Sequence, residues 1–160
     1  MSSSGRNLSP RFFQSVKRAP LITALCIKEL MSTFPTAIDP EKVGEYPAAT
    51  KSGGGFFYDE VLEYRVWCRP WLGAPDEFDG EIYYYAFSTF EEAAEFSRAT
   101  KGSEEPLVLV RQFEWINEPE KGQYIHNKGE RITEWLVEWL EGSKRELSSI
   151  PEFIQSKKNA

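Results

Sequence analysis

The strongest alternation of hydrophobic and polar positions runs from Tyr58 to Arg69. The residues predicted for one face are mostly apolar and those for the other face are mostly charged: Tyr58, Leu62, Tyr64, Val66 and Cys68 against Asp59, Glu63, Arg65 and Arg69. A period of two is typical of a β-strand with one buried face and one face in water. The sequence therefore predicts a strand that is ended by Pro70 and exposes its charged face to solvent.

A second strand and a helix are predicted downstream, with a tight connection between them. The segment 82–87 is rich in aromatic residues that suit a half-buried sheet. Thr89 and Glu92 form a capping box, in which the hydroxyl accepts from the Glu92 amide and the carboxylate reaches back to the Thr89 amide. Apolar or small residues then keep helical spacing toward Gly102, a typical stop signal.

The segment 107–116 predicts a third strand, apolar on both faces at its start and therefore central in the sheet. A turn that begins at Glu118 would place Pro119 where its fixed φ is favourable. This turn would connect the strand to 123–127, so the sequence predicts a hairpin.

The run that follows the hairpin, 131–140, has two interpretations. A helix would use Ile132, Trp135, Leu136, Trp139 and Leu140, and a strand would use Trp135, Val137 and Trp139. We favour the strand because the hairpin leads directly into it, and the helix stays open.

This order of elements predicts an α+β fold, a mainly antiparallel sheet with one principal helix on one face, formed by residues 58–142. Prolines and a Gly53–Gly55 cluster predict an irregular arm over 31–57. The segment 143–160 is a polar tail, in which Ser149 and Glu152 repeat the capping-box pattern and predict one short helix.

Residues 1–30 differ in charge from the rest of the chain. They hold five basic residues and one acidic residue, a charge of +4, and because the whole chain carries -6, residues 31–160 carry -10. An upstream extension of a chain that starts at Met31, an organelle-targeting peptide and a functional tail all fit this segment. The apolar run 21–27 is too short to span a bilayer, so no membrane association is predicted and the cytoplasm is the default location.

The composition argues against several kinds of site. An acidic body repels phosphate backbones, so nucleic acid is an unfavourable partner. Cys26 and Cys68 are the only cysteines, which predicts a reducing compartment, no disulfide framework and no metal site. Gly53–Gly55 lacks the lysine and hydroxyl of a phosphate-binding loop, so a flexible joint is predicted instead. The single histidine, His126, could act as a base only if a carboxylate such as Glu114 oriented it.

The aromatic content, 14% of the chain, is the most unusual feature. Consecutive aromatic residues at 83–85 must occupy both faces of their strand. An aromatic second face is typical of a partner surface or an apolar ligand groove, although the arm or the tail could also cover it. The sequence therefore predicts a small soluble binding or homodimerising module without a cofactor, with these candidate binding residues: Tyr64, Trp67, Tyr84, Trp115 and His126.

Four stretches of the chain resemble small bacterial proteins, some of which are assigned to the GNAT type of acetyltransferase: GGGFFYDEVLEYRVW, YYYAFSTFEEAAEFS, LVLVRQFEWINEPEKGQY and ERITEWLVEWLEGSKR. The resemblance implies a fold that holds acetyl-coenzyme A by backbone amides in a turn of the form Arg/Gln-x-x-Gly-x-Gly/Ala. Here Arg111 and Gln112 are followed by FEWIN without glycine, so no binding residue is carried over. A GNAT-like N-acetyltransferase is the alternative function.

Overall fold

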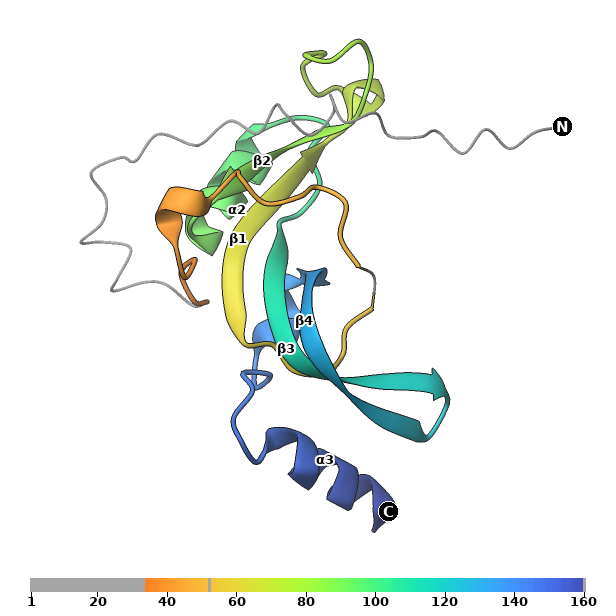
Figure 1. The fold of residues 1–160 in the computed structure, drawn as a ribbon. Coiled ribbons are helices and arrows are strands. Elements are labelled where there is room, and N and C mark those ends of the chain that lie inside the picture. The colour runs from red at the N-terminus through yellow and green to blue at the C-terminus, as the bar shows by residue number, and fades with distance from the viewer. Residues whose placement is uncertain (1–33, 52, 160) are drawn as a thin grey trace, which may run out of the picture.

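The computed structural model describes residues 34–51 and 53–159. Its centre is a curled, four-stranded antiparallel sheet with the order β2-β1-β3-β4 (Figure 1). The strands are β1 (Glu60–Cys68), β2 (Tyr83–Phe87), β3 (Leu107–Glu120) and β4 (Gln123–Leu136). Two α-helices of ten residues each accompany it, α2 (Phe90–Ala99) and α3 (Ser149–Lys158). The α+β fold with an antiparallel sheet is thus confirmed, whereas a single principal helix is not.

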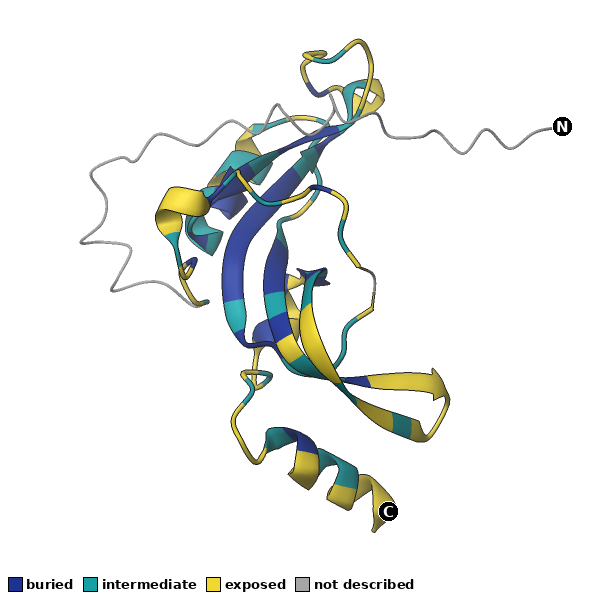
Figure 2. Cartoon of the chain, viewed as in Figure 1, coloured by how far each residue is buried: buried dark blue, intermediate teal, exposed yellow. Residues whose placement is uncertain are grey.

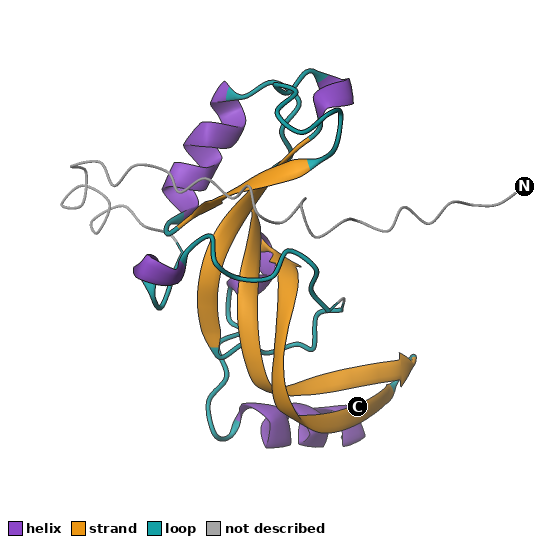
Figure 3. Cartoon of the chain, turned by 45° about the horizontal axis from the view of Figure 1, so that its top comes forward, coloured by secondary structure: helices purple, strands orange, loops and turns teal. Residues whose placement is uncertain are grey.

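The predicted strands occupy their expected places, but the hairpin is longer than expected. β3 and β4 extend past the end of β1 as a long two-stranded hairpin (Figure 3). The last pair is Glu120 with Gln123, so the loop contains only Lys121 and Gly122. Gly122 has a φ of 86°, a conformation that glycine adopts at no steric cost. The predicted turn at Glu118 is therefore wrong.

The ambiguous run 131–140 changes conformation in its middle. It is β-strand through Leu136 and then forms a short 3₁₀-helix, η4 (Val137–Leu140). The favoured strand is correct for the first half only, because the chain turns at Val137 to bury that residue and Leu140 in the core.

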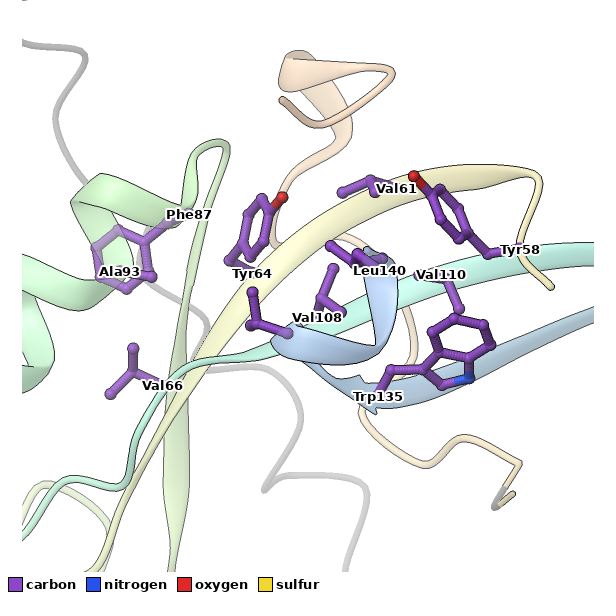
Figure 4. Packing of buried hydrophobic residues seen from close by; sticks show 11 residues of the cluster. Tyr58, Val61, Tyr64, Val66, Phe87, Ala93, Val108, Val110, Trp135 and Leu140 are labelled. Atoms are coloured by element: carbon purple, nitrogen blue, oxygen red, sulfur yellow. The ribbon is translucent and has the colours of Figure 1, made fainter. Parts of the chain in front are cut away.

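The helix α2 begins as the capping box predicts. The Thr89 hydroxyl accepts a hydrogen bond of 3.2 Å from the Glu92 amide. The helix ends at Ala99 with Thr100 as its C-cap residue, so it stops before the predicted Gly102. Ala93 belongs, with Phe87 and Tyr64, to the principal hydrophobic cluster between this helix and the sheet (Figure 4).

The capping box predicted in the tail is not formed. The Ser149 hydroxyl accepts from the Glu146 amide at 2.8 Å, and the Glu152 amide donates to the Ser148 carbonyl. Ser149 is already the first helical residue of α3, so its side chain supports the preceding turn instead of capping the helix.

The charged face of β1 is buried, which contradicts the prediction of a face in water. The side chains of Glu63 and Arg65 are both 0% exposed. The first part of the arm, residues 34–51, covers them, and its Ala37, Val43 and Ala48 pack with Tyr84 and Ala86 of β2. Figure 2 shows β1 buried along most of its length.

A network of charged and polar groups joins this arm to the sheet. The Glu63 carboxylate accepts from the Arg65 Nε and from the Gly44 amide, each at 2.7 Å. Arg65 also donates to the carbonyls of Pro47, at 2.7 Å, and Ala48, at 3.3 Å. Burial raises the pKa of Glu63, whereas Arg65 and the Gly44 amide oppose that shift. The arm thus supplies the hydrogen bonds that replace water around the buried pair.

The segment boundaries predicted from the sequence stay predictions. The predicted extension 1–30 lies outside the described residues. Within the described part of the chain, no helix has the length and apolar character needed to cross a membrane.

Replacing Glu63 with alanine tests the importance of this network. Glu63→Ala would leave the Arg65 guanidinium buried without its closest carboxylate, so the free energy of unfolding should fall by about 3 kcal/mol. Urea denaturation followed by tryptophan fluorescence measures this change. Glu95→Ala, at an exposed position on α2, is the control and should change stability by less than about 0.5 kcal/mol. Equal effects of the two substitutions would refute a structural role for the pair.

Candidate functional site

A pocket of about 430 Å³ lies between the arm and the end of β4. The arm contributes Gly54, Gly55 and Phe56 to its lining. The opposite side comes from β4, η4 and the residues just after them: Trp135, Glu138, Trp139, Glu141 and Ser143. Its volume lies in the range typical of small-molecule sites, about 300–1,000 Å³.

Two indole rings form a corner of this pocket. The rings of Trp135 and Trp139 have centroids 6.0 Å apart and an interplanar angle of 70°. Trp135 is 2% exposed and belongs to the core, whereas Trp139 is 44% exposed. The chain changes from strand to 3₁₀-helix between the two residues, so their side chains do not point in the same direction as they would four residues apart in one strand.

The Trp135 indole contains a polar group that the core does not satisfy. Its Nε1 is buried and finds no hydrogen-bond acceptor among residues 34–51 and 53–159. In Figure 4 this nitrogen lies on the edge of the ring turned away from Val110. Buried side-chain donors in native proteins normally have a partner, so this group is a feature that a structural role alone does not explain.

The arm side of the pocket is fixed by Gln112. The Gln112 Nε2 donates to the carbonyls of Gly54 and Phe57, each at 2.8 Å. Its Oε1 accepts from the Arg131 Nε and the Thr133 hydroxyl, also at 2.8 Å each. The flexible joint predicted at Gly53–Gly55 is therefore tied to the sheet through the Gly54 carbonyl.

Gly55 and Phe56 have unusual backbone conformations. Gly55 has a φ of 77°, and a Cβ atom there would lie 2.5 Å from both Arg131 and Gln112, so only glycine fits. Phe56 has a φ of 72°, which is costly for a residue with a side chain. Its ring packs against Phe153 of α3, with centroids 4.8 Å apart, which helps to hold this conformation.

The charged residues that line the pocket are both acidic. They are Glu138 and Glu141, and no lysine or arginine side chain belongs to the lining. Neither carboxylate has an ion pair with any residue that the structure describes, in contrast to Asp59 and Glu114, which both pair with Arg145. The pocket therefore combines aromatic surfaces with two carboxylates whose charge is not neutralised by any ion pair among residues 34–51 and 53–159.

The residues predicted from the sequence as binding residues lie elsewhere. Tyr64 is buried beside Phe90 of α2, and its hydroxyl donates to the Pro35 carbonyl. Tyr84 is buried beneath the arm, beside a partly buried Trp67 that donates to Glu134 at 3.1 Å. Trp115 lies under the Arg131 guanidinium, 4.3 Å from ring centroid to Cζ. None of these four lines the pocket, and their role in binding stays a prediction.

The fifth candidate, His126, has the carboxylate neighbour that the sequence suggested. Its Nε2 lies 2.9 Å from the Glu114 Oε1. The other oxygen of Glu114 accepts from Arg145 at 2.6 Å, and Arg145 also binds the buried Asp59 at 2.7 Å. Because Arg145 already neutralises Glu114, this carboxylate is a weak support for a histidine base.

Arg111 and Gln112, the two residues compared with the coenzyme-binding turn, have structural roles. Arg111 and Gln112 lie within β3, where Arg111 pairs with Glu60 at 2.6 Å, and not in a turn between a strand and a helix. In the part of the chain that the structure describes, no group of three or more His, Cys, Asp or Glu side chains could hold a metal ion.

Comparison with known proteins identifies no relative: no family model, no curated protein and no solved structure matches this chain. The assignment of function therefore depends on the geometry of the pocket.

The position of Cys68 determines how readily its thiol can react. The side chain is buried, and burial raises its pKa to about 11, while a hydrogen bond with Tyr83 opposes the shift. At pH 8 only about one thiol in a thousand would be the reactive thiolate. In a Cys26→Ser variant, where Cys68 is the only cysteine, Ellman's reagent should react slowly with the native protein and rapidly in urea. Rapid reaction of the native protein would contradict the buried position.

Proposed function

We propose that the chain is a non-catalytic binding module whose pocket takes an organic ammonium cation. The observation that carries this proposal is the corner formed by Trp135 and Trp139 in a pocket that also contains Glu138 and Glu141, two carboxylates with no ion pair among the described residues. Indole faces attract cations through their quadrupole, and Trp139, which is 44% exposed, is the ring that an ammonium group can contact, while the buried Trp135 lines the pocket from the core.

The charge of the pocket favours a cation over other ligands. A neutral apolar ligand would contact the aromatic rings equally well but would desolvate Glu138 or Glu141 without compensation. A methylated or otherwise alkylated ammonium loses little hydration on entering an aromatic site and also pairs with the carboxylates.

The acetyltransferase alternative receives less support from this geometry. Acetyl-coenzyme A carries a pyrophosphate, which would meet two carboxylates in this pocket. Homodimerisation through the aromatic residues also stays a prediction, and light scattering after size exclusion tests it.

Calorimetric titration with choline tests the proposed function. We expect the protein to bind choline, and to bind the neutral isostere 3,3-dimethylbutan-1-ol about tenfold more weakly, because only choline carries the charge. Trp139→Ala should weaken choline binding by about tenfold, since it removes one wall of the corner. Glu141→Gln should weaken it less and should reduce its dependence on salt.

The matched control is Trp71→Ala, because Trp71 is an exposed tryptophan that does not line the pocket. This variant should bind choline as the unchanged protein does. Equal affinities for choline and its neutral isostere, or no binding of either at millimolar concentration, would refute the cation site. Acetyl-coenzyme A that bound more tightly than choline would favour the alternative instead.

A further inference from the structure

A second pocket, of about 390 Å³, lies beside η4. Its apolar lining comes from the arm, from α2, from the segment before β3 and from η4 itself: Phe34, Phe90, Ala94, Pro106 and Val137. Glu138 belongs to the lining of this pocket and also to that of the cation pocket. The two pockets therefore adjoin, and η4 lies between them.

The 3₁₀ geometry of η4 explains how consecutive residues serve different pockets. With three residues in a turn, successive side chains point about 120° apart. Val137 lines the second pocket, Trp139 lines the cation pocket, and the exposed Glu138 lies between them. A ligand that fills both pockets must cross the surface at Glu138.

The charges around the two pockets favour a basic ligand. Glu138, Glu141 and Glu105 are exposed carboxylates in the combined lining, against one guanidinium, that of Arg98. The second pocket has an apolar floor, so the group that fills it best is an uncharged side chain. A free ammonium compound occupies only the first pocket and leaves the second one empty.

We infer that the partner of this site is a peptide segment, in which a basic side chain enters the cation pocket and a nearby apolar side chain enters the second pocket. This inference rests on the proposed function, since the basic side chain uses the same corner of Trp135 and Trp139. The peptide backbone crosses Glu138, whose carboxylate can accept from a backbone amide. Because the two side chains belong to one chain, binding of the first raises the effective concentration of the second.

A series of short peptides tests this inference on the full 160-residue chain. Each peptide is acetylated and amidated and contains trimethyl-lysine and leucine separated by one, two or three glycines. In the control series, glycine replaces the leucine. At one of the spacings we expect the leucine peptide to bind about tenfold more tightly than its control, since burial of a leucine side chain can supply the roughly 1.4 kcal/mol that a tenfold change requires.

A pair of protein variants assigns that gain to the second pocket. Ala94→Leu fills the pocket from α2 with a good helix former and should remove the tenfold gain while choline binds unchanged. Ala99→Leu is the matched control, because Ala99 lies on the same helix but does not line the pocket, and it should keep the gain. Circular dichroism and urea unfolding test whether both variants are folded.

The outcomes separate the two proposals. If choline binds and no leucine peptide exceeds its glycine control, the cation site stands and the peptide inference is wrong. The inference is also wrong if Ala94→Leu and Ala99→Leu keep the same gain. If neither choline nor any peptide binds, the proposed function fails, and the peptide inference fails with it.

Discussion

The buried guanidinium of Arg65 is the group on which the arrangement of arm and sheet depends. It pairs with Glu63 on its own strand and binds the carbonyls of Pro47 and Ala48 in the arm. Charged groups without water need such partners, so the arm must follow this path for the pair to be buried. The same path continues through Lys51, whose amide donates to the Ile132 carbonyl, and brings Gly54 to the pocket.

The sequence predicts the local elements of this fold, but it does not show which face of β1 the arm covers. Alternation over 58–69 and the Thr89 capping box depend on residues close together in the chain, and both were predicted correctly as strand and helix start. Whether Glu63 and Arg65 face water or an arm depends on residues about 20 positions away. The arm has no periodic pattern to reveal that contact, because its hydrogen bonds to the pair come from backbone groups.

The pocket was harder to predict for a related reason. Trp135 and Trp139 are four residues apart, a spacing that fits one face of a helix and also one face of a strand. In the structure their rings stand at 70° to each other, and the chain passes from β4 into η4 between them. The other wall, Gly54 to Phe56, is about 80 positions away in the sequence. The glycine cluster and the high aromatic content marked the segments that form the two walls. Neither feature indicates that these segments lie side by side.

The distribution of ion pairs separates structural charges from those available to a ligand. Asp59, Glu60, Glu63 and Glu114 all bind an arginine, and they connect the arm, the sheet and the tail. Glu138 and Glu141 have no such partner within the described residues, although they lie beside two indoles in a concave site. In an acidic body, carboxylates that collect around an aromatic pocket repel one another unless a cation joins them. If an external cation binds here, as we propose, it would therefore relieve a repulsion that the described residues leave in place.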